Sequence, residues 1–360
     1  MTKDEIRYVS LDGMRGLAAI IVALFHYNPT LAPGGYLAVD FFFVLSGFVL
    51  ARNYSGQFAA GLTSRDFMIT RLIRLYPLFA CGVVIGTAFA VQGELRHSDD
   101  HLPIGQLLIA LPLNLIMLPS PTDSTLFPVN APAWSLFCEV LANLAMALVL
   151  VRLTPRTLAL VALGSLIALL VAECVVQVSP AHLAAGVSVA SEGDTWNGFA
   201  IAILRTAFSF TIGMLIAQQK RMPELPTSAW IIGCFLLLPV LLALPVPMRA
   251  RFPFDLLVVA LLSPLLVVMG SRFQPSAFLA PAATLTGEIS YALYAVHLPV
   301  AHTFQFLGKK TGLAPATLAL PYLLAALSLA WLSVKFIDKP MRSALTRFTR
   351  SSQTARHSAN

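Results

Sequence analysis

Charged residues are scarce in this chain: only 11% of its 360 residues are Asp, Glu, Lys or Arg, and 57% are hydrophobic. A soluble domain usually has about a quarter of its residues charged. Apolar runs of about twenty residues recur along the whole length, which is the length that crosses a bilayer as a helix. The composition therefore excludes an ordinary soluble domain and predicts an all-α, polytopic transmembrane helical bundle.

Paired cysteines are also missing, and no cleavable leader is expected. The four cysteines (Cys81, Cys138, Cys174 and Cys234) sit in or beside apolar runs without paired spacing, so we expect buried thiols and neither disulfides nor a metal site. The first apolar run lacks a small-residue cleavage site and is expected to remain as an anchor. The excess of 7 positive charges suits loops beside an anionic leaflet, and no basic stretch with interleaved aromatics indicates nucleic-acid binding.

Eleven apolar runs are present, at 10–28, 36–53, 70–91, 104–118, 134–151, 157–178, 196–218, 229–244, 254–270, 287–307 and 314–336. The run at 104–118 is short and is surrounded by prolines. If it does not cross, ten later basic residues fall on the cytoplasmic side with both termini, and four fall outside. The ten are Arg152, Arg156, Lys220, Arg221, Arg272, Lys335, Lys339, Arg342, Arg347 and Arg350, and the four are Arg249, Arg251, Lys309 and Lys310. Because basic residues favour the cytoplasm, we predict ten full spans, with 104–118 re-entrant or interfacial.

The chain reads as one membrane domain, residues 1–342, followed by a basic polar cytoplasmic tail, residues 343–360, that is expected to fray at its end. Residues 92–133 are expected to form the largest extracytoplasmic region. No internal repeat of the transporter kind is visible, and no soluble domain is expected within or after the spans.

The run from Leu11 to Asn28 carries two ionisable side chains, Arg15 and His26. At ~100° per residue, their separation of eleven residues places both on one helix face, roughly 16 Å apart along the axis. Each is costly to keep in hydrocarbon. We therefore take Arg15 and His26 as the leading catalytic candidates.

Two carboxylates are expected at a depth similar to that of His26. Asp40 lies near the start of the second run, and Glu139 lies about one turn into the run that begins PAWSLFCE. A carboxylate beside an imidazole fixes its tautomer and raises its basicity, which suits a general base. A local cap or interfacial pair is the alternative for Asp40. The preceding Gly34 and Gly35 are expected to form the tight turn and to leave room for a substrate.

Arg71 and Arg74 are three residues apart on one helix face, with Arg15 at a similar depth. This arrangement suits binding of phosphates from the cytoplasm. Cytoplasmic anchoring of the span by basic residues explains them equally well.

A polar stripe of Ser290, Tyr291, Tyr294 and His297 follows one face of the run at 287–307. Tyr291, Tyr294 and His297 are candidate substrate- or donor-binding residues. A lone intramembrane histidine is more often a helix–helix hydrogen-bonding residue than a catalyst, so His297 ranks below His26. Trp134 is expected in an interfacial aromatic belt. Arg205 needs a carboxylate partner that the sequence does not identify.

Several segments together resemble the membrane-bound acyltransferase-3 family. They are YVSLDGMRGLAAIIVALFH, GGYLAVDFFFVLSGF, RLIRLYP, PAWSLFCE, SYALYAVH and FIDKPMR, spread over residues 8–342. The resemblance implies a ten-span acyltransferase of the inner (cytoplasmic) membrane. Such an enzyme moves an acyl group, often acetyl, from cytoplasmic acyl-coenzyme A to an extracytoplasmic glycan or lipid-linked sugar. Acetyl-coenzyme A would be a co-substrate, with no permanently bound cofactor.

The resemblance also implies residue roles. Arg15 and His26 match the family's arginine–histidine pair, which is taken as essential for transfer. Arg71 and Arg74 match its proposed donor-phosphate arginines, and Gly34–Gly35 matches its glycine pair. Two other classes stay open from the residues alone: a transporter or flippase for a polysaccharide precursor, and a glycan polymerase or ligase that uses no coenzyme A.

Overall fold

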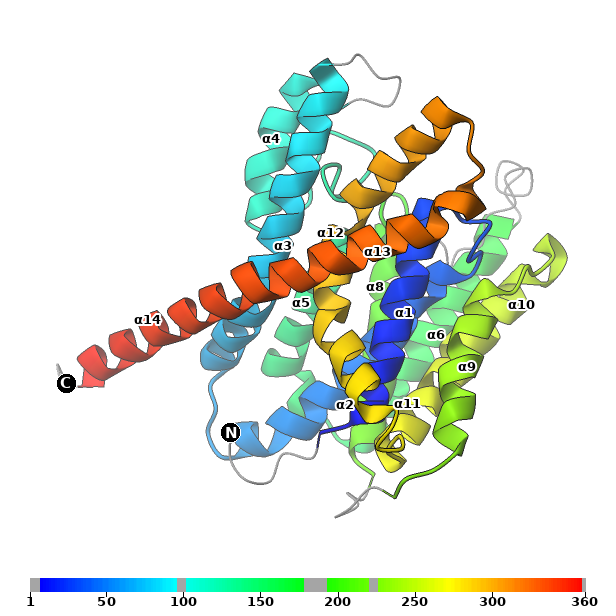
Figure 1. Ribbon diagram of the computed structural model, residues 1–360. Coiled ribbons are helices and arrows are strands. Elements are labelled where there is room, and N and C mark those ends of the chain that lie inside the picture. Colours follow the sequence, from blue (N-terminus) through cyan, green and yellow to red (C-terminus); the bar gives the residue numbers. More distant parts are fainter. Residues whose placement is uncertain (1–6, 96–101, 178–192, 220–225, 358–360) are drawn as a thin grey trace.

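The computed structural model describes residues 7–95, 102–177, 193–219 and 226–357, and helices make up the regular structure of these ranges (Figure 1). The α-helices are α1 (Val9–Tyr27), α2 (Ala38–Ala59), α3 (Ser64–Leu95), α4 (Ile104–Leu115), α5 (Ala133–Leu148), α6 (Pro155–Gln177), α8 (Phe199–Ala217), α9 (Trp230–Ala243), α10 (Met248–Leu257), α11 (Ser263–Arg272), α12 (Ala280–Thr311), α13 (Pro315–Ser333) and α14 (Lys339–His357). Short 3-10 turns η1 (Gly35–Leu37) and η2 (Leu150–Arg152), and π turns η4 (Val258–Leu262) and η5 (Val334–Asp338), join or interrupt them.

Every predicted apolar run is occupied by a helix, with α10, η4 and α11 together covering the run at 254–270. Among the described residues, seven helical stretches are long and apolar enough to cross a membrane, and α4, α5 and α9 are shorter apolar helices. The predicted class, an all-α polytopic bundle, is confirmed. Residues 96–101 and the basic pair Lys220–Arg221 lie outside the described residues.

Helix α4 is the segment that the charge distribution singled out. Its 12 residues rise only ~18 Å, against a hydrocarbon core of ~30 Å. It packs beside α3 (Figure 1). It is shorter than the other two short apolar helices, α9 with 14 residues and α5 with 16, which agrees with the prediction that 104–118 is the run that does not cross.

Helices α1 and α12 run in the same direction. Gly13 of α1 lies against Ala283 of α12, and Gln305 of α12 donates a 2.8 Å hydrogen bond to the carbonyl of Tyr27, so residue numbers rise together along the contact. If α4 crossed and every other predicted span did too, α1 and α12 would be antiparallel. Their parallel packing therefore also supports ten crossings.

Glycines allow α1 and α12 to approach closely. A Cβ atom at Gly287 would lie 2.6 Å from the Cβ of Asp12, and one at Gly16 would collide with Thr286. Small residues at a helix contact let backbones pack tightly where lipid gives no hydrophobic driving force. Side chains on facing sides of these two helices consequently meet directly.

The start of α5 lies inside the bundle rather than at its surface. Asn130 donates a hydrogen bond of 3.1 Å to the carbonyl of Ala295 in α12, and the Tyr294 hydroxyl donates one of 3.2 Å to the carbonyl of Pro132. Trp134 is only 9% exposed. The predicted interfacial position of Trp134 is therefore wrong, because the segment before α5 folds into the bundle and carries the helix start with it.

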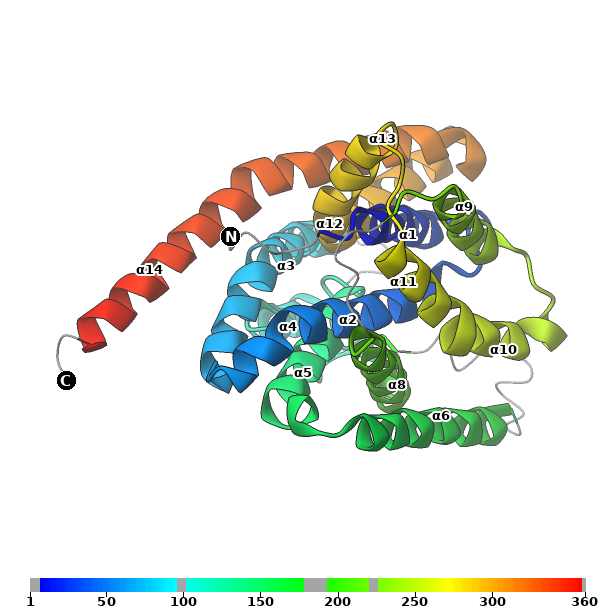
Figure 2. The same ribbon diagram turned by 90° about the horizontal axis from the view of Figure 1, so that it is seen from below.

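The described part of the C-terminal tail, residues 343–357, is helical, and the end that is expected to fray, residues 358–360, lies outside the described residues. The chain continues from α13 through η5 into α14, which is helical to His357 and projects away from the bundle (Figures 1 and 2). Cys81, Cys138 and Cys234 are free thiols, as predicted. The side chain of Cys174 lies outside the described part of the structure.

Two glycines of α2 give a matched test of this packing. A Cβ atom at Gly47 would collide with the carbonyl of Phe210 in α8, whereas one at Gly56 would meet nothing within 4 Å. We expect Gly47→Ala to destabilise the detergent-solubilised protein by about 1–3 kcal/mol, the usual cost of overpacking. Gly56→Ala should leave the thermal midpoint unchanged or raise it slightly, since alanine favours helix. Equal midpoints for the two variants would contradict the close α2–α8 contact.

Candidate functional site

Arg15 is fixed against the start of α12. Its Nε donates to Ser290 Oγ at 2.9 Å, and its Nη2 donates to the carbonyl of Gly287 at 2.8 Å. The same Nη2 forms an ion pair with Asp12 at 3.1 Å, one turn earlier in α1. The guanidinium is therefore held in one position by two helices, with its charge partly balanced.

His26 meets the same helix further along. Its Nδ1 lies 3.2 Å from Nε2 of His297 and 3.0 Å from the carbonyl oxygen of Val22. His297 is fully buried, whereas His26 is only partly buried. Since Arg15 and His26 both contact α12, the prediction that they share one face of α1 is confirmed.

Asp40 does not lie against His26, which corrects one expectation. Its carboxylate accepts hydrogen bonds of 3.2 Å and 2.5 Å from Arg205 of α8, and both side chains are fully or almost fully buried. Asp40 is thus the partner that Arg205 required. The sequence pattern could not show that Asp40 faces α8.

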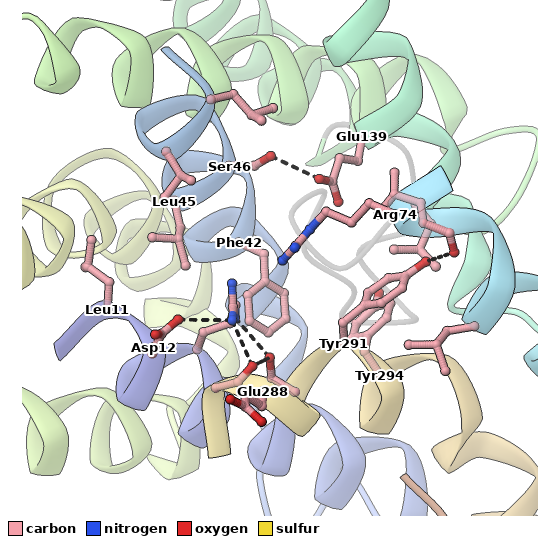
Figure 3. Close-up of a pocket in the computed structure, with 18 of the residues that line it drawn as sticks. Leu11, Asp12, Phe42, Leu45, Ser46, Arg74, Glu139, Glu288, Tyr291 and Tyr294 are labelled. Atoms are coloured by element: carbon pink, nitrogen blue, oxygen red, sulfur yellow. Dashed lines mark hydrogen bonds and ion pairs between the residues drawn. The ribbon is translucent and has the colours of Figure 1, made fainter. Parts of the chain in front are cut away.

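Glu139, like Asp40, does not lie beside His26. It accepts hydrogen bonds of 3.0 Å from Arg71 and 3.0 Å from Ser46, at the arginine end of the bundle (Figure 3). The expected position of Glu139 beside His26 is wrong. Helix α5 already starts within the bundle, so the residues from Ala133 to Glu139 carry the carboxylate on to the arginines. Among the described residues, the side chain that is hydrogen-bonded to the His26 ring is the imidazole of His297 and not a carboxylate.

A cavity of about 620 Å³ opens between α1, α2, α3, α5, α12 and the start of α14 (Figure 3). Its volume suits a small-molecule ligand. Six basic and four acidic side chains line it. The basic ones are Arg7, Arg15, Arg71, Arg74, Lys339 and Arg342, and the acidic ones are Asp12, Glu139, Glu288 and Asp338.

Most of these charges are already paired. Arg71 bonds Glu139 at 3.0 Å, and Arg342 bonds Asp338 at 3.0 Å. Arg74 is different: its guanidinium points into the cavity (Figure 3) and forms no hydrogen bond or ion pair within the described ranges. Arg71 and Arg74, which were predicted as a pair, therefore line the same cavity. The guanidinium of Arg71 is bonded to Glu139, whereas that of Arg74 is available to an anionic ligand.

The remaining candidates are largely held by protein contacts. Tyr291 donates a hydrogen bond of 2.6 Å to the carbonyl of Leu75, and the Tyr294 and Ser135 hydroxyls are 2.6 Å apart; both tyrosines line the cavity.

Gly34 and Gly35 form the turn into η1, as predicted, but protein fills the space beside them. Cβ atoms there would press on the carbonyl of Leu242 and on Phe25.

The sequence reading missed Asp12, Ser46 and Glu288 as cavity residues. Asp12 had a visible signal: it lies three residues before Arg15, on the same helix face. Ser46 and Glu288 carried none, since only the folded bundle brings them to the arginines. Among the described residues, no group of three or more His, Cys, Asp and Glu side chains is placed to hold a metal ion, and no predicted site residue requires one.

These features define an integral-membrane helical bundle with a cavity between its helices, lined by more basic than acidic side chains, and with a histidine pair in its interior. The family is given by comparison with known proteins. The family model described as "Acyltransferase domain" matches residues 8–335, so the chain belongs to the membrane-bound acyltransferase-3 family. It is an acyltransferase, as the resemblance implied.

Several curated proteins are similar over parts of the chain. "Protein 2 in picA locus" of Rhizobium radiobacter is 38% identical over 181 residues, 46% of this chain and 94% of that protein. The peptidoglycan O-acetyltransferase OatA of Listeria monocytogenes is 37% identical over 93 residues, 25% of this chain and 15% of OatA. A putative O-acetyltransferase of Staphylococcus aureus strain COL is 38% identical over 110 residues, 29% of this chain and 18% of that protein. No solved structure matches the chain.

The Asp40–Arg205 pair yields a test that separates stability from chemistry. Asp40→Asn removes a carboxylate that pairs with the buried Arg205, and breaking a buried ion pair from one side costs about 3–5 kcal/mol of stability. The double variant Asp40→Leu with Arg205→Met removes both charges and should regain much of that loss, together with transfer activity. Thermal unfolding and transfer assays in the same detergent check this. A stable double variant without activity would show that Asp40 is needed for the reaction itself.

Proposed function

We propose that the protein is an O-acyltransferase that moves an acyl group, in the first instance acetyl, from cytoplasmic acyl-coenzyme A to a hydroxyl of an extracytoplasmic glycan or glycolipid. The observation that carries this proposal is the common face of α1, on which Arg15 borders the basic cavity and His26 lies three turns further along. The names of the O-acetyltransferase relatives support the choice of acetyl and of an oxygen acceptor. In this scheme the protein lies in the inner membrane with both termini cytoplasmic.

The donor would occupy the cavity with its phosphates near Arg74 and Arg15. Arginine binds phosphate oxygens with two parallel hydrogen bonds, and the surrounding low dielectric strengthens them. The axial distance of roughly 16 Å between Arg15 and His26 is comparable to the reach of a pantetheine arm. The thioester would therefore arrive at His26 while the charged nucleotide stays at the cytoplasmic end.

His26 would supply the base. The acceptor hydroxyl gives its proton to Nε2 of His26 while its oxygen bonds to the thioester carbonyl carbon. The carbon–sulfur bond then breaks, and coenzyme A leaves as the thiol with the proton from His26. The acyl group thus changes sides of the membrane, but the donor does not.

A covalent route uses the same nitrogen. Nε2 attacks the thioester carbon, the carbon–sulfur bond breaks, and coenzyme A leaves as the thiolate, which takes a proton from solvent. The acceptor oxygen then takes the acyl group from the N-acylimidazolium and loses its proton to solvent, which restores the neutral His26 ring. Release of one equivalent of thiol per enzyme before any acceptor is added would select this route.

Inverted membrane vesicles containing the native glycans test the proposal directly. Labelled acetyl-coenzyme A supplied outside such vesicles should transfer its label to the glycan fraction, and His26→Ala should abolish the transfer while the protein remains folded. Movement of solute without covalent labelling would select a transporter. Full activity of His26→Ala would contradict the role given to His26.

Arg74→Ala tests the donor site. Loss of a hydrogen bond to a charged group costs about 1.5–3 kcal/mol, so we expect the KM for acetyl-coenzyme A to rise roughly tenfold or more. Arg65, also on α3 but exposed and outside the cavity, is the matched control, and Arg65→Ala should leave KM unchanged. Equal KM values for the two variants would remove Arg74 from the donor site.

A further inference from the structure

His26 and His297 form a hydrogen-bonded pair whose geometry fixes the proton positions. Nδ1 of His297 lies 3.0 Å from the carbonyl oxygen of Leu293 and 2.9 Å from that of Tyr294. Carbonyl oxygens only accept hydrogen bonds, so this nitrogen carries the proton of the neutral ring. Nε2 of His297 then has a free lone pair, and it faces Nδ1 of His26 at 3.2 Å.

The same reasoning continues to His26. Its Nδ1 faces two acceptors, the lone pair of His297 and the carbonyl oxygen of Val22 at 3.0 Å. Nδ1 therefore carries the proton, and Nε2 of His26 is left unprotonated. Among the described residues, Nε2 of His26 has no hydrogen-bond partner, and the ring is partly exposed.

We propose that His297 is the positioning residue for His26, taking the place that a carboxylate occupies in most base-and-orienting-group pairs. This inference rests on the proposed function, in which Nε2 of His26 is the reacting atom. His297 holds the His26 ring through the Nδ1 proton. When Nε2 takes the acceptor's proton, or bonds to the acyl carbon, the ring becomes cationic and the hydrogen bond to His297 strengthens.

A neutral orienting group suits the membrane interior. A carboxylate at this depth would need its own counter-charge, as Asp40 needs Arg205, and burying a further charge is costly. An imidazole tied to the carbonyls of its own helix adds no charge. The two carboxylates that the sequence offered as partners for His26, Asp40 and Glu139, are bonded to arginines.

Replacing His297 by side chains of different length tests its role. The amide oxygen of glutamine can occupy the position of the histidine Nε2, whereas the amide of asparagine reaches only the position of Nδ1. In inverted vesicles given labelled acetyl-coenzyme A, we expect His297→Asn and His297→Leu to lower apparent kcat roughly 10- to 100-fold, the cost of one hydrogen bond to a charged group. His297→Gln should regain most of the rate, and the donor KM should stay constant in all three.

His302→Leu is the matched control, because His302 is exposed on the same helix, and its rate should equal that of the unmodified protein. Thermal midpoints in detergent establish that each variant is folded, and the Gln–Asn comparison keeps the test valid if His297→Leu does not fold. Equal rates for His297→Gln and His297→Asn, or an unchanged rate for His297→Leu, would overturn the positioning role. Activity of His26→Ala would instead overturn the proposed function, so the two failures are distinguishable.

Discussion

The parallel packing of α1 against α12 is the contact on which the rest of the site depends. Glycines remove the side chains that would hold these helices apart, so that a Cβ at Gly287 would already press on Asp12. As a result, Arg15 reaches Ser290 and His26 reaches His297 along one shared seam. Larger residues at these positions would move the helices apart and so separate both polar pairs together.

The charged side chains among the candidate residues are found in two regions, the cavity and the buried Asp40–Arg205 pair. At the cavity end, paired side chains such as Arg71 and Glu139 shape a basic site and leave Arg74 for an anion. In the interior, Asp40 and Arg205 cancel each other and join α2 to α8. Within the described residues, the hydrogen bonds of the His26 and His297 rings are to each other and to backbone carbonyls, so neither ring is bonded to a charged group.

The sequence predicted the helical class, the extent of the apolar runs and the shared face of Arg15 and His26, because these follow from local periodicity. It failed for Asp40, Glu139 and Trp134, whose surroundings are set by contacts distant in the chain. The depth of α5 was misjudged because the preceding segment enters the bundle, which hydropathy does not reveal. His297 was ranked below His26 as a structural histidine, since periodicity alone does not show which face of α12 meets α1.

The most direct test of the account is an experimental structure of the protein in lipid with a non-hydrolysable acetyl-coenzyme A analogue. The account predicts the phosphates in the cavity against Arg74 and the acyl carbonyl carbon roughly 3–4 Å from Nε2 of His26, the spacing of a near-attack geometry. It also predicts that Nδ1 of His26 remains bonded to His297. An analogue bound outside the cavity, or with its acyl group remote from His26, would contradict it.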